Sequence, residues 1–335
     1  MGAIESNRRF YDEYVAGLIH ARFSEYEDRI AVGIVGEGSD CFGYDDLISR
    51  DHDFGTGVCL WLTDQDMDLF GYSLSIAYNE LVDSAERKYY TDRLRERRGV
   101  ITIHDFYSNI LQIDCDTDNC TMTEEQWYSL DHSCLKTAVN GTVFRDDLGQ
   151  FTAFREFLLG YYPDKVWKRR IAEQLHEYSA AIQVNYARCM ARKDTVAAEI
   201  CRIQGLRSAM ELYFLLKRTY PPYYKWTYQA LTELEGSRSD PLMQDFQGNP
   251  ARPLTGNRLD AQGEFSGKIQ ELADTRCDRG AWEGTKYHPN RPNFKDRIIS
   301  LAEEIASEIA DMLIGSGLTD ARNYYLERYV DYFIE

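Results

Sequence analysis

The sequence predicts an α+β protein, with a mixed-sheet domain over residues 1–150 and an all-α helical domain over residues 151–335. In the first part, short apolar runs rich in β-branched residues alternate with segments of helical periodicity. Beyond residue 150, apolar residues recur with a period near 3.6 through several long segments. The composition, 44% hydrophobic and 28% charged, is that of a folded chain.

Each expected element has a local signal. The apolar positions of residues 5–29 recur at three- and four-residue steps, which predicts a helix. Thr63 is expected to cap a helix that begins with acidic residues. Strands are predicted at 30–35, 58–62, 100–103 and 142–144. Further helices are predicted at about 150–161, 164–192, 194–219, 224–235, 295–315 and 319–334, with a loop-rich insertion around 236–293.

Charge and targeting signals restrict the partners. Acidic residues outnumber basic ones by 55 to 38, giving a net charge of −17, which argues against binding of long nucleic acid. The N-terminus lacks the apolar core of a signal peptide, and no run is long enough to span a membrane. We therefore expect a cytoplasmic protein without a membrane partner. The eight cysteines do not form a zinc-ligand pattern.

The segment after the first predicted strand carries the chemistry. Gly36 ends that strand in a tight turn, Gly38 permits close backbone approach, and Ser39 offers an N–H and a hydroxyl to a phosphate. Asp51 and Asp53 are expected to open the second strand, and residues two positions apart in a strand point to the same face. Their carboxylates are hard oxygen ligands suited to Mg²⁺ or Mn²⁺, and a cation there would neutralise nucleotide phosphates.

This pattern, Gly38-Ser39, eleven residues and then Asp51-x-Asp53, resembles the signature of the DNA polymerase β-type nucleotidyltransferase superfamily. The chain is more closely similar to a bacterial family known only as a domain of unknown function, over roughly residues 30–235. That similarity continues through Cys59 to Thr63, Thr142 to Asp146, Tyr161-Tyr162-Pro163, Val166-Trp167, Phe214 to Arg218 and Lys225-Trp226. The superfamily resemblance implies a mixed-sheet catalytic domain, two-metal chemistry and a helical domain that closes over the site.

One feature departs from the superfamily pattern. A third metal-binding carboxylate is usual on the next strand, but residues 100–103 contain no acid, and Asp105 lies just beyond them. Either Asp105 substitutes as a metal ligand, or two protein carboxylates and the nucleotide phosphates suffice. A third alternative is that the chain descends from an active nucleotidyltransferase and has lost its catalytic activity. The other acids of the loop, Asp40, Asp45 and Asp46, are expected to face solvent or cap turns.

The helical half contributes three further candidates. Arg218 and Lys225 flank the Pro221-Pro222 break among tyrosines, a combination suited to a nucleotide, although a basic helix end is an equal alternative. Glu211, within an apolar run, could act as a general base for an acceptor hydroxyl. Its simpler interpretation is a charge on the solvent face of a helix.

Two functions follow as hypotheses. The first is a Mg²⁺-dependent nucleotidyltransferase that moves a nucleoside monophosphate from ATP or another NTP to a hydroxyl of a small molecule or protein, releasing pyrophosphate. The second is a catalytically weak or inactive nucleotide-binding module that acts as an antitoxin or sensor. An oligomer is compatible with either.

Overall fold

The computed structural model describes residues 2–44, 55–84, 97–236 and 264–334. These residues form two compact units, which meet in sequence between Tyr161 and Tyr162. The first unit contains the sheet and the second is helical, so the predicted α+β class is confirmed. Asp45, Asp46, Asp51 and Asp53 lie outside the described residues.

A four-stranded mixed sheet forms the centre of the first unit, in the order β3-β2-β1-β4. β1 pairs antiparallel with both β2 and β4, whereas β2 and β3 are parallel. All four strands lie within one residue of their predicted positions at each end. The strands are β1 (Ala31–Ile34), β2 (Cys59–Leu62), β3 (Gly99–Thr102) and β4 (Thr142–Arg145).

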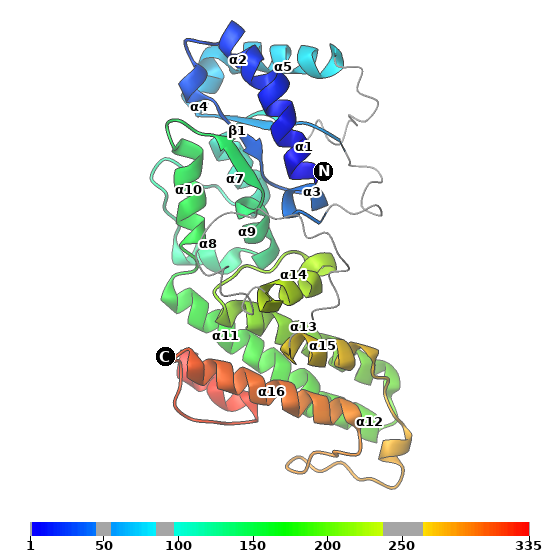
Figure 1. The fold of residues 1–335 in the computed structure, drawn as a ribbon. Helices are drawn as coiled ribbons and strands as arrows, with labels where there is room; N and C mark the ends of the chain where they lie inside the picture. Colours follow the sequence, from blue (N-terminus) through cyan, green and yellow to red (C-terminus); the bar gives the residue numbers. More distant parts are fainter. Residues whose placement is uncertain (1, 45–54, 85–96, 237–263, 335) are drawn as a thin grey trace. The chain divides into compact units, whose positions relative to one another are not determined.

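Helices cover both faces of this sheet. Figure 1 shows α1 (Ala3–Phe10), α2 (Ala16–Arg22) and α5 (Tyr72–Ser84) on one side of β1 and α7 (Ile103–Leu111) on the other. The first face buries alternate strand residues against α1, α2 and α5, as the two-residue period of a strand requires. On the second face Trp61 is fully buried and stacks on Phe151, with ring centroids 3.8 Å apart. The sheet is therefore the middle layer of three.

The direction of the strands decides which loops meet. Because β1 is antiparallel to β2 and β4, and β3 is parallel to β2, the end of β1 and the beginnings of the other three strands share one edge. We call this the Gly38 edge, after the turn that follows β1. The ends of β2 and β3 lie at the opposite edge, where α4 (Asp64–Asp66), α7 and α10 (Gln150–Leu159) begin.

Helix boundaries agree with the predicted ones where the apolar period extends over many residues. Thr63 caps α4 as predicted, because its hydroxyl accepts a hydrogen bond from the Asp66 N–H. The helix predicted at 5–29 ends earlier, at Arg22. The helices α7, α8 (Glu124–Ser129), α9 (His132–Val139) and α15 (Glu264–Asp274) were not predicted.

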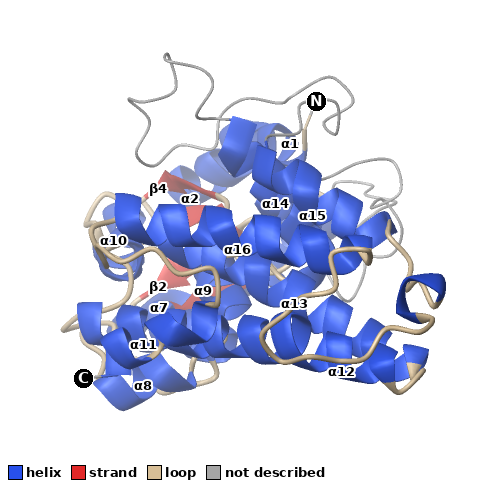
Figure 2. Cartoon of the chain, turned by 90° about the horizontal axis from the view of Figure 1, so that it is seen from below, coloured by secondary structure: helices blue, strands red, loops and turns tan. Residues whose placement is uncertain are grey.

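The second unit consists of helices (Figure 2). α11 (Asp164–Tyr178) continues through a π-helical stretch (Ser179–Asn185) into α12 (Tyr186–Ala191) and packs against α13 (Thr195–Leu216). α14 (Tyr224–Gly236) and α16 (Arg297–Gly315) also belong to the second unit. Gly205 on α13 allows close packing against the π-helical stretch, since a Cβ at this position would lie 2.5 Å from the Cβ of Ile182.

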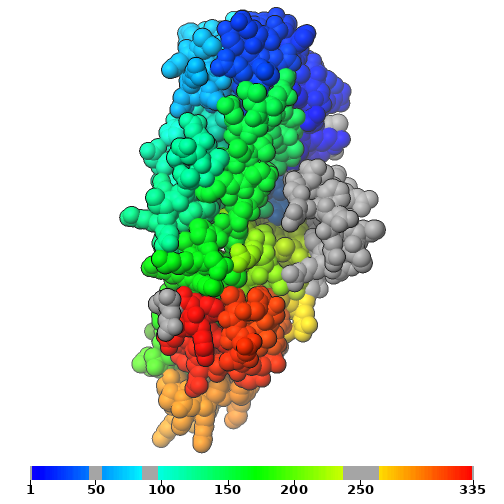
Figure 3. All heavy atoms as spheres, turned by 90° about the vertical axis from the view of Figure 1, so that its left-hand side faces the viewer, coloured from blue at the N-terminus to red at the C-terminus, as the bar shows by residue number. Residues whose placement is uncertain are grey.

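The C-terminal segment corrects one prediction. Instead of a helix at 319–334, the chain forms a short 3₁₀ turn (Leu326–Tyr329) and α17 (Asp331–Ile334). Figure 3 shows this red segment beside the orange-red α16 on one face of the second unit. Arg322 connects the two through an ion pair with Asp311 at 2.8 Å. Of the aromatic residues in this segment, Tyr329 and Phe333 are buried, and the 3₁₀ turn and α17 contact α11.

A buried carboxylate on α16 gives a prediction of pH dependence. Burial raises the pKa of Glu303, which accepts a hydrogen bond from Gln183 at 3.1 Å. A raised pKa in the folded state means that stability falls as pH rises from the unfolded value near 4.5 through the folded value. We expect Glu303→Gln to raise the free energy of unfolding at pH 7 and to flatten its dependence on pH, measured by urea unfolding between pH 4 and 8. A lower stability at pH 7 would contradict this.

Candidate functional site: the Gly38 edge of the sheet

Two glycines shape the turn after β1. Gly36 and Gly38 have φ angles of +117° and +112°, which L-residues with side chains rarely adopt. The short helix α3 (Ser39–Phe42) begins directly afterwards. The tight turn predicted at the end of the first strand is therefore confirmed. It leaves Gly38 and Ser39 only partly buried at this edge of the sheet.

Asn140 holds this turn from the chain segment that leads into β4. Its side-chain oxygen accepts a hydrogen bond from the Gly36 N–H at 2.9 Å, and its amide nitrogen donates to the Gly36 carbonyl at 2.7 Å. Asn140 is itself buried. One side chain thus satisfies both backbone groups of a glycine in an unusual conformation.

We expect Asn140→Ala to destabilise the first unit by about 2–4 kcal/mol, because it would leave two buried backbone groups without partners. Thermal and urea unfolding measure this effect. Asn119→Ala is the matched control, since Asn119 is exposed and bonds only within its own loop. Equal stability of the two variants would contradict the proposed role.

A buried ion pair lies beneath the same turn. Arg98 Nη2 donates to Asp40 Oδ2 at 2.8 Å, and the two side chains are 1% and 10% exposed. From the sequence, Asp40 is expected to face solvent or to cap a turn. The solvent interpretation is wrong, because Arg98 at the amino end of β3 reaches this carboxylate across the edge of the sheet. Burial also raises the pKa of the Cys41 and Cys59 thiols beside Arg98, so neither is a ready nucleophile.

Arg97 contacts the turn from the same end of β3. Its Nη1 donates to the Glu37 carbonyl at 3.2 Å. A Cβ at Gly38 would lie 2.7 Å from this nitrogen and would also collide with the Asp40 carboxylate. A glycine is therefore required at position 38 by its neighbours as well as by its φ angle.

Asp105 lies at the other edge of the sheet. It occupies the first turn of α7, where its N–H donates to Thr102 Oγ1 at 2.9 Å and its exposed carboxylate contacts His104. Thr102 is the last residue of β3, and a strand of this length spans about 13 Å. The structure does not bring Asp105 together with Gly38 and Ser39.

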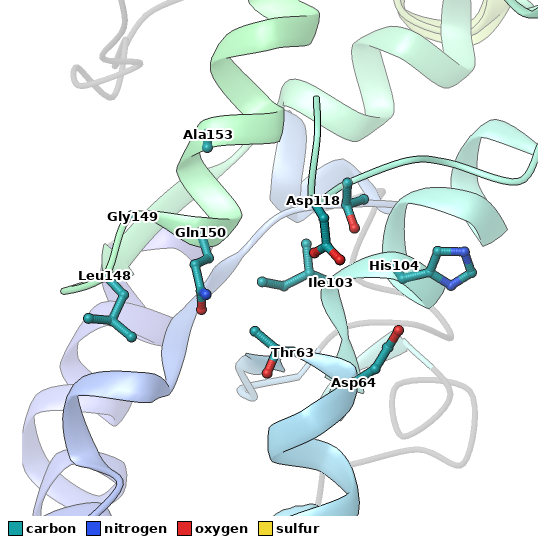
Figure 4. Close-up of a pocket in the computed structure, with 10 residues that line it drawn as sticks. Thr63, Asp64, Ile103, His104, Asp118, Leu148, Gly149, Gln150 and Ala153 are labelled. Atoms are coloured by element: carbon teal, nitrogen blue, oxygen red, sulfur yellow. The ribbon is translucent and has the colours of Figure 1, made fainter. Parts of the chain in front are cut away.

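A shallow pocket of about 220 Å³ occupies that other edge (Figure 4). The helix starts of α4, α7 and α10 line it, and the carboxylates of Asp64 and Asp118 are among its polar groups. Two carboxylates make it unsuitable for a triphosphate. Within the described ranges, His, Cys, Asp and Glu side chains form no group of three that could hold a metal ion.

The remaining predicted residues belong to the second unit. The Arg218 guanidinium lies 3.7 Å over the Trp167 ring and pairs with Asp164 at 3.1 Å. Lys225 is exposed, with its ammonium 4.9 Å from the Trp226 ring. These two residues lie on either side of the break between α13 and α14.

Glu211, also in the second unit, accepts a hydrogen bond from Arg207 at 2.8 Å, one helical turn earlier on α13. Its side chain is 13% exposed, so it is more enclosed than a residue on the solvent face of a helix.

Comparison with known proteins gives one match. The model of a family described as "Domain of unknown function (DUF4037)" matches residues 127–227. This region includes β4, the Tyr161-Tyr162-Pro163 segment and Lys225, but it does not reach Gly38 or Asp51. Neither a curated protein nor a solved structure matches the chain. Among the described residues, the helices are too short or too polar to cross a bilayer.

Proposed function

We propose that this chain is a Mg²⁺-dependent nucleotidyltransferase, which moves a nucleoside monophosphate from an NTP to a hydroxyl of a small molecule or protein. The observation that supports this most is the antiparallel pairing of β1 with β2. It means that the Gly38-Ser39 turn follows β1 at the edge where β2 begins, and Asp53 precedes Cys59, the first residue of β2, by only six residues. The described half of the signature, Gly38-Ser39, therefore lies at the edge of the sheet where β2, the strand that follows Asp51-x-Asp53 in the sequence, begins.

The sequence signature suggests a division of roles. Gly38 allows a phosphate to approach the backbone, and Ser39 offers its N–H and hydroxyl as donors. Asp51 and Asp53 are the proposed ligands of the cation, and two carboxylates are a donor set that suits Mg²⁺. When bound, the cation would neutralise charge on the transferred phosphoryl group.

Three residues of the second unit also have a role in the proposal. We assign Arg218 and Lys225 to holding the substrate through their cations and neighbouring rings. Glu211, which accepts a hydrogen bond from Arg207, is the proposed general base for the acceptor hydroxyl. The net charge of −17 favours a small molecule or a protein as acceptor over long nucleic acid.

The chain differs from the superfamily pattern at the third metal-binding carboxylate. β3 (Gly99–Thr102) has none, and Arg97 and Arg98 stand at its amino end. We therefore favour a site in which two protein carboxylates and the nucleotide phosphates hold the metal.

The direct test is pyrophosphate release by the full chain with ATP, GTP, CTP or UTP, in Mg²⁺ or Mn²⁺, combined with mass spectrometry of the products. We expect pyrophosphate with at least one NTP, abolished by EDTA, and a nucleotidyl adduct on an acceptor from a panel of hydroxyl compounds and proteins. Absence of pyrophosphate under all these conditions would contradict the proposal.

The same absence of a carboxylate in β3 favours one alternative, a nucleotide-binding module without turnover. It predicts that an NTP with Mg²⁺ raises the melting temperature while no pyrophosphate appears. Pyrophosphate release at a rate dependent on the native sequence would exclude this alternative.

A further inference from the structure

Two cysteines of the second unit lie against each other. Cys189 is on α12, Cys201 is on α13, and these two helices pack together. The Cys201 thiol shares a hydrogen bond with the Cys189 thiol. Both residues are free cysteines and both are partly exposed. The pair therefore consists of two reduced thiols in contact, at a position that a small molecule in solution can reach.

The turn between α12 and α13 fixes this contact. Lys193 has a φ angle of +65°, and the Asp194 N–H donates to the Cys189 carbonyl at 3.0 Å, which closes the end of α12. The Asp194 carboxylate accepts a hydrogen bond from the Ala197 N–H at 3.0 Å and caps α13. Because one residue holds both helix ends, the direction of α13 relative to α12 is defined.

The packing of α13 places Cys201 on the side that faces α12. Ala198 and Gly205 are buried, and Cys201 lies three residues after the first and four before the second, so the three share one face of the helix. Gly205 packs closely on Ile182, in the π-helical stretch that continues into α12. The contact of the two thiols thus follows from the packing of the two helices.

We propose that Cys189 and Cys201 are an oxidation site and form a reversible disulfide, an inference independent of the proposed function. The thiolate of one cysteine attacks a sulfur of a small-molecule disulfide and displaces a thiolate, leaving a mixed disulfide. The thiolate of the second cysteine attacks the sulfur of the first and displaces the other half. The two cysteines lose two electrons and two protons in total, and the small-molecule disulfide is reduced to two thiols.

Cys277 also contacts these helices, but it is not the expected partner. Its thiol forms hydrogen bonds with Glu199 on α13 and Tyr186 on α12. Burial and the Glu199 carboxylate raise the pKa of Cys277 to about 12, so this thiol stays protonated. Burial and the Cys189 side chain raise the pKa of Cys201 to about 11. Since the thiolate is the reacting form, the disulfide should form about 10-fold or more faster at pH 9 than at pH 7.

The test is oxidation of the folded full chain by oxidised glutathione at pH 7 and pH 9, followed by blocking of free thiols with N-ethylmaleimide, trypsin digestion and mass spectrometry. Trypsin cuts after Arg192, between the two cysteines, so a disulfide would join two peptides. We expect these joined peptides as the main intramolecular disulfide, lost on treatment with dithiothreitol. Cys189→Ser and Cys201→Ser should each abolish it, whereas Cys277→Ser, the matched control, should leave its yield unchanged.

Comparison with the unfolded chain tests whether the fold is responsible. In concentrated urea, proximity in the sequence favours Cys115 and Cys120, five positions apart, over Cys189 and Cys201, twelve positions apart. Faster joining of Cys189 to Cys201 in the folded chain than in urea would support the proposal. A folded chain that forms only mixed disulfides with glutathione, or that joins Cys201 to another cysteine in preference, would overturn it, as would equal rates in the folded and unfolded chains.

Discussion

Replacing Asp51 or Asp53 by asparagine is expected to lower nucleotidyl transfer by about 100-fold or more. Asparagine keeps the size of the side chain but removes the charge that a divalent cation requires. The two residues precede β2 in the sequence, and β2 begins at the edge where the Gly38 turn follows β1. Under the proposed function, each variant would lose a ligand of the cation. Pyrophosphate release and incorporation of labelled nucleotide measure the effect.

Asp105→Asn is the informative comparison. Asp105 lies beyond the carboxyl end of β3, whereas Gly38 and Ser39 lie at the amino end of that strand. We therefore expect this variant to keep activity within about twofold of the native chain, with the same dependence on Mg²⁺ concentration. A loss comparable to that of Asp51→Asn would mean that Asp105 reaches the metal. Undiminished pyrophosphate release in both Asp51→Asn and Asp53→Asn would mean that the metal centre has been wrongly assigned.

The strands were predictable because their signals are local. Each coincides with a short and largely apolar run of the sequence, and a strand needs only a few such positions. The long helices of the second unit were predictable for the same reason, since their apolar period persists over many residues. α8 is only 6 residues long, too short for a period to be distinguished from chance.

The helix predicted at 319–334 is wrong because apolar residues with helical spacing also occur in a segment that is not a continuous helix. The hydroxyl of Tyr329 donates to the Ala321 carbonyl and accepts from the Asn323 N–H, which holds this segment in a compact turn. These bonds provide the backbone with partners other than those of a helix. The apolar period of the sequence does not indicate that the backbone forms these hydrogen bonds instead of helical ones.

The site shows the same division between local and distant information. The glycine turn could be predicted, since φ angles follow from a few neighbouring residues. Asn140 and Arg98 could not, because they reach the turn from 104 and 58 positions away in the sequence. The location of Asp105 depended on the direction of β3, and only the pairing of strands supplies that direction.

Arg98→Met is expected to destabilise the first unit by about 3–5 kcal/mol, the second large effect that the structure predicts. The variant would leave the Asp40 carboxylate, 10% exposed, without its cationic partner. Asp40→Asn should cost a similar amount, because it would leave Arg98 buried and charged. Urea unfolding followed by the fluorescence of Trp61, which is buried in this unit, measures both.

The double variant Asp40→Leu/Arg98→Met separates the cost of an unpaired charge from a loss of packing. An apolar pair of similar volume needs no charge compensation, so we expect it to recover most of the stability lost in either single variant. Single variants that each cost less than about 1 kcal/mol would instead mean that water reaches the pair. Since Asp40 follows Ser39 directly, the double variant should also bind NTP more weakly while remaining folded. That combination would show that the ion pair holds the Gly38 turn in a conformation that binds NTP, beyond its contribution to stability.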